Sequence, residues 1–174
     1  QINHLDISNL VTLQELYTVD AFGPNFDTLD VKSNIDLTFL DCGNNQLTSL
    51  DLSNNTALTM LYCHKNQLTS LDLSYNPDLF LLHCHDNQVL NSLDLSNISD
   101  LQELYCHANS LDTLNLINKL DLMTLYCQSN QLSTLDLSSN YSLNTLNCSD
   151  NQLTSLDLSN NLHLDSLGCS GNSF

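Results

Sequence analysis

The chain repeats one pattern of apolar and polar positions with a period of 21 or 22 residues. Five segments follow it as Leu-x-x-Leu-x-Cys-x-x-Asn-x-Leu: LTFLDCGNNQL (37–47), LTMLYCHKNQL (58–68), LQELYCHANSL (101–111), LMTLYCQSNQL (122–132) and LNTLNCSDNQL (143–153). Two more fit with another apolar residue at the eleventh place, LFLLHCHDNQV (79–89) and LDSLGCSGNSF (164–174). Self-similarity at a fixed period near 20 residues predicts a repeat architecture in which successive turns stack.

Side chains of a strand point alternately to opposite faces, so the pattern predicts which residues of each repeat face the interior. We expect places one, four, six, nine and eleven to face inward, and places three, five and seven to face outward. The next segment, such as LTSLDLSNN (47–55), also alternates, and it is too short and too rich in Ser, Asn and Asp for a helix. The pattern predicts a right-handed solenoid with a concave parallel sheet, short parallel strands or extended segments on its convex side, and little or no helix.

The N-terminal part is less regular. Thr18 stands where Cys is expected in LQELYTVDAF (13–22), and the next repeat begins 24 residues on, so FGPNFD (22–27) is expected to hold an extra loop. We expect one continuous domain, with irregular turns over 1–36 and regular turns of 21 or 22 residues over 37–174. A one-residue insertion near 89–91 predicts a local bulge. Because the chain begins on Gln1 and not on Met, we interpret it as a mature or excised fragment.

Charge narrows the range of partners. The chain has 20 acidic residues, 3 Lys and no Arg, which gives a formal charge of -17. This balance disfavours nucleic acid and anionic membranes, since both require basic side chains to neutralise phosphates. No apolar run approaches the roughly 18 residues of a membrane helix, so we expect no membrane insertion.

Stacking turns each place of the repeat into a column of similar residues. The cysteine column contains Cys42, Cys63, Cys84, Cys106, Cys127, Cys148 and Cys169. Their odd number and even spacing disfavour a disulfide framework, so we expect buried free thiols, with metal ligands or disulfides as the alternative. An asparagine column contains Asn45, Asn66, Asn87, Asn109, Asn130, Asn151 and Asn172. Buried amides must be hydrogen-bonded, so we expect these to form a ladder with the backbone.

Two further columns lie in the second half of the repeat. Asn55, Asn76, Asn140 and Asn161 are expected to bond the backbone in the same way, with lapses at Ile98 and Lys119. An acidic column contains Asp51, Asp72, Asp94, Asp136 and Asp157, is interrupted by Asn115, and is extended by Asp6 and Asp30. We interpret it as a solvated stripe near the hydroxyls of Ser49, Ser70, Ser92 and Ser155, with Ca²⁺ binding as the alternative.

The outward places carry the candidate binding residues, because solenoids usually bind on the concave sheet. A group of Tyr and His side chains, called the aromatic patch below, occupies places five and seven of the middle turns: Tyr62, His64, His83, His85, Tyr105, His107 and Tyr126. Phe39, Met60, Phe80 and Leu81 are expected to lie exposed beside it. Exposed aromatic clusters are typical of interaction surfaces. Cross-strand stacking that only stabilises the sheet is the alternative.

The repeats resemble those of bacterial leucine-rich-repeat proteins, in which Leu or Cys can fill the sixth place. The 21-residue form with Cys is similar to internalins, and NQLTSLDLS is similar to repeats in secreted or surface proteins of Bacteroidetes. The resemblance covers 37–174 and implies a leucine-rich-repeat solenoid that serves as a secreted or cell-surface binding module, in a polypeptide with further domains. It rests on scaffold positions, so it implies no catalytic residue, cofactor or particular ligand.

We therefore expect a non-enzymatic extracellular binding or adhesion module that recognises a protein or glycan through its concave face. A structural spacer or display stalk of a larger surface protein is the alternative. No catalytic constellation is visible, and no metal site is assigned, although stacked His64, His85 and His107 would be suited to chelation. A row of hydroxyl pairs of the kind that binds ice is interrupted at Asn91 and Asp112.

Overall fold

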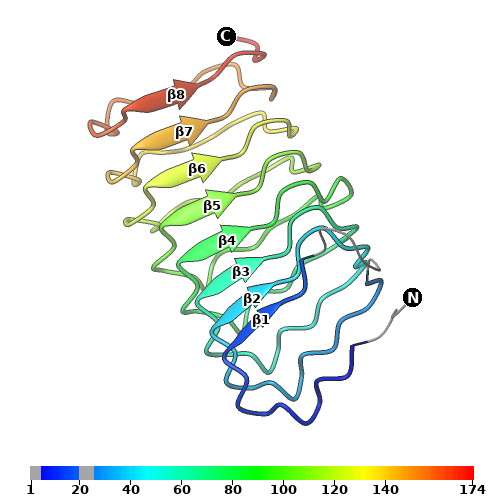
Figure 1. Ribbon diagram of the computed structural model, residues 1–174. Helices are drawn as coiled ribbons and strands as arrows, with labels where there is room; N and C mark the ends of the chain where they lie inside the picture. Colours follow the sequence, from blue (N-terminus) through cyan, green and yellow to red (C-terminus); the bar gives the residue numbers. More distant parts are fainter. Residues whose placement is uncertain (1–4, 20–25) are drawn as a thin grey trace.

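The computed structural model describes residues 5–19 and 26–174, and in this part of the chain eight short strands form one parallel sheet in sequence order. The strands are β1 (Glu15–Tyr17), β2 (Phe39–Asp41), β3 (Met60–Tyr62), β4 (Leu81–His83), β5 (Glu103–Tyr105), β6 (Thr124–Tyr126), β7 (Thr145–Asn147) and β8 (Ser166–Gly168). Figure 1 shows them stacked along one axis, with each of β2 to β7 followed by a return segment that leads to the next turn. The described residues form no helix, so the predicted solenoid is confirmed.

The register places identical repeat positions side by side. Leu40 pairs with Leu61, and Leu61 pairs with Leu82, so each column of the repeat becomes a continuous row through the molecule. The inward places are buried as predicted: in the first regular repeat Leu37, Leu40, Cys42 and Leu47 have no exposed surface. All seven cysteines are free, and only Cys169, in the last turn, is partly exposed. The cysteine column is therefore a row of buried thiols acting as small apolar side chains.

The return segment is extended and forms no strands in the described residues, so of the two forms expected on the convex side the structure has extended segments and not short strands. The predicted alternation still holds, since Leu50 and Leu52 are 7% and 1% exposed while Asp51 faces solvent. The N–H of Ser53 is donated to Asp51, and that of Asn55 to the Leu52 carbonyl. These local bonds use groups that a second ladder of strands would need.

Two predictions about the eleventh place were wrong. Val89 is 53% exposed, and the next residue, Leu90, fills the buried position. The inserted residue is absorbed by a turn at Gln88–Val89, which the Leu90 N–H closes on the Asn87 carbonyl at 2.8 Å. The predicted bulge is therefore this turn. Phe174 is 63% exposed, because no later turn of the described solenoid covers it.

The first turns keep the frame with substitutions. Thr18 occupies the cysteine place and is 9% exposed, with its N–H bonded to the Asp41 carbonyl at 2.7 Å. Phe26 occupies the eleventh place, since its N–H bonds Asn45 Oδ1 at 3.0 Å as the N–H of later leucines bonds later asparagines. The extra loop expected over 22–27 falls largely on residues 20–25, outside the described residues. The proposed division at residue 36 stays a prediction.

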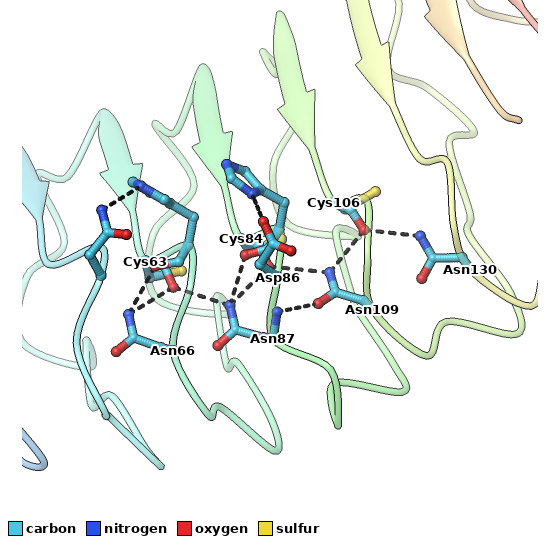
Figure 2. A network of polar contacts seen from close by, with 11 residues as sticks. Cys63, Asn66, Cys84, Asp86, Asn87, Cys106, Asn109 and Asn130 are labelled. Carbon is cyan, nitrogen blue, oxygen red and sulfur yellow. Dashed lines mark hydrogen bonds and ion pairs between the residues drawn. The ribbon is translucent and has the colours of Figure 1, made fainter. Parts of the chain in front are cut away.

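The first asparagine column forms the predicted ladder, drawn in Figure 2. Asn66 Nδ2 donates to the carbonyls of Cys63 in its own turn and Cys42 in the previous turn, at 3.1 and 3.0 Å. Its Oδ1 accepts the N–H of Leu47 at 2.9 Å. One side chain thus satisfies buried backbone groups of two successive turns, which a leucine at this place would leave unpaired.

The second asparagine column joins the return segments. Asn76 Nδ2 donates to the carbonyls of Leu52 and Asn55, both in the previous turn. Asn34 extends this column, and its Nδ2 donates to the carbonyls of Ile7 and Leu10. The column lapses as predicted at Ile98 and Lys119, which are 0% and 3% exposed. Lys119 Nζ reaches only the carbonyl of Ile117, at 3.5 Å.

Candidate binding site on the sheet face

Aromatic rings form two rows across the outward face of the sheet. The longer row contains Tyr17, Phe39, Tyr62, His83, Tyr105 and Tyr126, with successive ring centroids 4.6, 5.5, 4.5, 3.9 and 5.0 Å apart. The strand register brings the rings from Tyr62 to Tyr126 together, since parallel pairing places Tyr62 beside His83 and His83 beside Tyr105. Phe39 pairs with Glu15 and Met60 instead, so its ring reaches Tyr17 and Tyr62 diagonally. The row is longer than predicted, because Tyr17 and Phe39 continue it toward the N-terminus.

The second row is formed by three imidazoles at place seven, just after the strands. The rings of His64 and His85 stack at 4.8 Å, and those of His85 and His107 stack at 4.2 Å with an interplanar angle of 10°. The two rows meet in T-shaped contacts: the ring centroids of His64 and His83 lie 6.4 Å apart, and so do those of His107 and Tyr126. All seven residues of the aromatic patch therefore lie in one continuous ring cluster.

Stacking covers much of each ring. All seven residues of the aromatic patch are half-buried, and the side chain of His85 is 14% exposed. The expectation that Leu81 is exposed was wrong: it is 8% exposed, although it lies on the outward face. Phe39 and Met60 are half-buried as well. Since the ring faces are largely paired with one another, the surface offered to a ligand consists mainly of ring edges and polar tips.

Burial keeps the imidazoles of His64, His83 and His107 neutral at neutral pH. Partial burial first, and then the proximity of His85, lowers the pKa of His83 and of His107 to about 4. The same two causes lower the pKa of His64. Neutral imidazole carries one donor and one acceptor nitrogen, so these rings can both donate and accept hydrogen bonds.

Some polar atoms of this face have no protein partner. Nδ1 of His64, Nδ1 of His107 and Oε1 of Gln128 are buried and make no hydrogen bond. All three residues belong to the column at place seven. Buried polar atoms without a partner are costly in a folded protein, so each would be stabilised by an external group that reaches it after a small movement of its side chain. Sequence reasoning missed Gln128, although its place in the His column is readable from the repeat.

The motif LLHCHDNQ (81–88) contains two separate environments. Cys84 points into the core and is fully buried, and burial raises the pKa of its thiol to about 12. His83 and His85 lie on the outward side and contact their neighbours in adjacent turns. The thiol and the imidazoles therefore cannot act together as a nucleophile and base.

The acidic column holds backbone turns together. Asp51, Asp72 and Asp94 each accept the N–H of the serine two residues on, at 3.1, 3.0 and 2.8 Å. The sequence predicted the serines that precede each Asp as neighbours of the column. The observed partners are instead the serines that follow, Ser53, Ser74 and Ser96. Asn115 makes the same turn with the N–H of Ile117, which shows that the turn needs the side-chain oxygen and not its charge.

Comparison with known proteins agrees with this repeat. A family model described as Leucine Rich repeats (2 copies) matches residues 35–79. The functional domain of InlJ from Listeria monocytogenes, which includes a cysteine ladder, superposes with a TM-score of 0.93 over 97% of this chain at 36% identity. The chain is an internalin-like leucine-rich-repeat protein. The leucine-rich-repeat chain spans 37% of that InlJ structure.

Two other structures extend the comparison. The internalin InlF from Listeria monocytogenes matches with a TM-score of 0.86 at 25% identity, over 98% of this leucine-rich-repeat chain and 52% of InlF. The complex of TLR13 with ssRNA13 matches with a TM-score of 0.70 at 21% identity, over 93% of this chain and 26% of TLR13, and shows the fold alone. Among curated protein sequences none matches significantly.

Leucine-rich-repeat proteins of this kind are typically protein-binding modules. In the described residues, no helix could span a membrane.

Proposed function

We propose that this leucine-rich-repeat protein is a non-enzymatic module of a secreted or cell-surface bacterial protein, and that it binds a protein ligand through the aromatic patch. The ring cluster on the outward sheet face carries this proposal. It gathers tyrosine and histidine edges on a rigid surface, and it leaves Nδ1 of His64 and of His107 without partners. Tyr is enriched in protein interfaces because it combines apolar area with one polar tip.

The geometry favours a protein ligand over a glycan. Sugars stack on the open faces of aromatic rings, whereas here successive ring centroids lie 3.9–5.0 Å apart from Tyr62 to Tyr126 and cover one another. Ring edges and polar tips are suited to hydrogen bonds with backbone and side chains of a partner. The formal charge of -17 supports a basic partner surface and opposes RNA or DNA.

The proposal can be tested with Tyr62→Ala and Tyr105→Ala on protein and glycan arrays, together with wild type. We expect at least a tenfold loss of affinity for the ligand that wild type selects, because tyrosines in the centre of an interface often contribute about 2 kcal/mol. Tyr75→Ala is the matched control, since Tyr75 is 53% exposed and lies in a turn of the return segment. Equal binding by all four proteins would assign the ligand to another surface.

A spacer or display stalk is the second candidate. Continuous stacking of six rings along the sheet supports it, since cross-strand ring pairs stabilise a sheet without any ligand. In that case Tyr105→Ala would lower the melting temperature, and no array component would bind wild type above the level of an unrelated acidic protein.

A further inference from the structure

We propose that His85, Asp86 and His107 form a binding site for a divalent transition-metal ion of the Zn²⁺ class. One ligand atom from each of the three side chains lies within 4.8 Å of the other two. Two imidazole nitrogens and a carboxylate oxygen are a donor set that Zn²⁺ uses in proteins, with a fourth position left for water or a ligand. Neither the resemblance of the repeats nor the proposed protein ligand implies this site.

Part of the site already has suitable geometry. Nδ1 of His85 lies 2.9 Å from Oδ2 of Asp86, and Figure 2 shows the Asp86 carboxylate directed at the imidazole. Two ligand atoms bound to one tetrahedral Zn²⁺ at about 2.0 Å lie roughly 3.3 Å apart. An ion therefore fits between His85 and Asp86 with a small movement. The Nδ1 proton of the neutral imidazole moves to Nε2 by exchange with solvent, so that the Nδ1 lone pair is free to bind the ion.

His107 completes the set by rotation of its ring. Its imidazole stacks on that of His85 at 4.2 Å with an angle of 10°, so the in-plane lone pairs of the two rings run parallel and do not yet converge. Nδ1 of His107 is buried and has no hydrogen-bond partner, so no bond has to be broken for it to turn. The ring is held by stacking alone, which a metal–nitrogen bond readily exceeds in strength.

The backbone positions Asp86 for this role. Asp86 has φ of 57°, and this left-handed conformation at place eight places the carboxylate beside the imidazole of its own turn. Outside the three ligands, Lys65 is a charged group close enough to act on His107, and it opposes a cation. The formal charge of -17 raises the local concentration of any divalent cation. Imidazole ligands favour Zn²⁺, Cu²⁺ and Ni²⁺ over Ca²⁺ and Mg²⁺.

The test is calorimetric titration of the folded, reduced protein without a polyhistidine tag, using ZnCl₂ and, separately, CaCl₂. We expect one Zn²⁺ per chain and no heat from Ca²⁺ at the same concentration. Asp86→Asn and His107→Gln should each weaken Zn²⁺ binding at least about tenfold. Asn tolerates a positive φ, so Asp86→Asn keeps the backbone and removes only the charged ligand. His163→Gln is the control, since His163 is exposed in a distant turn.

Cobalt distinguishes this site from the cysteine column. Co²⁺ bound by nitrogen and oxygen lacks the thiolate-to-cobalt charge-transfer band that cysteine ligation produces, and we expect no such band. The proposal is overturned by absence of saturable Zn²⁺ binding, by unchanged affinity in Asp86→Asn, or by the thiolate band. Circular dichroism shows that each variant is folded before titration. No protein ligand is needed, so the result is independent of the array experiment.

Discussion

The residue at place eight of the repeat has a positive φ, a left-handed backbone conformation that most residue types disfavour. Asn44, Lys65, Asp86, Ala108 and Ser129 have φ between 52° and 57°. Asn and Asp tolerate this region through local hydrogen bonds, whereas a β-carbon generally costs about 1–2 kcal/mol there. The conformation is needed because the chain turns sharply after the strand, while the N–H of Ala108 still bonds the Gln128 carbonyl of the next turn.

The first prediction concerns this strain. Ala108→Gly should raise the free energy of unfolding by about 1 kcal/mol, because glycine adopts φ of 52° without a steric penalty. Urea denaturation of wild type and variant measures the change. Ala57→Gly is the matched control: Ala57 is not among the residues with positive φ, so glycine there should not stabilise. Equal effects at the two positions would contradict the explanation from backbone strain.

At the scale of the element, each turn is held to the next by the asparagine columns as much as by the strands. The strands are three residues long, too short to set the register by themselves. Asn66 adds bonds to the carbonyls of Cys42 and Cys63 and to the N–H of Leu47. Buried backbone groups must be paired, so a repeat without this side chain loses the connection between two turns.

We accordingly expect Asn66→Ala to lower the free energy of unfolding by about 3 kcal/mol or more, since it leaves buried backbone groups without partners. Urea denaturation followed by circular dichroism measures the loss. Asn54→Ala provides the comparison, because Asn54 is exposed and donates only to the Lys32 carbonyl. Its effect should stay within about 0.5 kcal/mol. A loss at Asn66 no larger than at Asn54 would mean that the strands alone hold the turns together.

The turns of the acidic column predict acid sensitivity. Hydrogen bonds from Ser53, and then the Lys32 ammonium 3.0 Å away, lower the pKa of Asp51 to about 2. A folded-state pKa below the ordinary value of about 3.9 means that ionised Asp51 stabilises the fold above that pH, and that this contribution is lost as the pH falls from about 4 to 2. Asp51→Asn should therefore show a smaller fall in melting temperature between pH 5 and pH 3 than wild type.

Asn115 makes this comparison meaningful, because an asparagine in the same column keeps the turn bond to Ile117 at 3.0 Å. The Asp51→Asn variant thus retains the oxygen acceptor and loses the titrating group. Parallel pH profiles for variant and wild type would show that Asp51 contributes nothing to acid sensitivity.

At the scale of the whole molecule, a net charge of -17 on a thin solenoid is the dominant electrostatic feature. Twenty acidic residues face only 3 Lys, one of which, Lys32, pairs with Asp51 at 3.0 Å, so most of the negative charge is uncompensated. Self-repulsion of this kind destabilises the folded state and keeps the protein in solution.

Salt should consequently stabilise this protein. Raising NaCl from about 0.01 to 0.15 M shortens the Debye length from about 30 to 8 Å, which screens repulsion between successive turns. We expect a higher midpoint of urea unfolding at the higher salt, and the same rise with choline chloride in place of NaCl. A rise with NaCl but not with choline chloride would indicate a specific sodium site. A fall in the midpoint would contradict the repulsion.

The sequence by itself determined the solenoid, the parallel stack and the buried columns. Several copies of one repeat agree on which positions are apolar, so the assignment of inward positions does not depend on any single segment. Leu40 and Cys42 could be placed inward, and Tyr62 and His64 outward, from strand alternation alone. Neighbours across turns followed from the period, so the meeting of His85 with His107 was also readable.

Only the tertiary structure decided where local backbone geometry changes the direction of a side chain from the one that its place in the repeat predicts. The insertion is absorbed so that Leu90 and not Val89 enters the core, because a turn closing on Asn87 shifts the register by one. The left-handed residue at place eight directs Asp86 toward His85, which strand alternation cannot predict. Side-chain stacking also decided that the patch presents ring edges, since exposure depends on neighbours in three dimensions and not on the facing of a single residue.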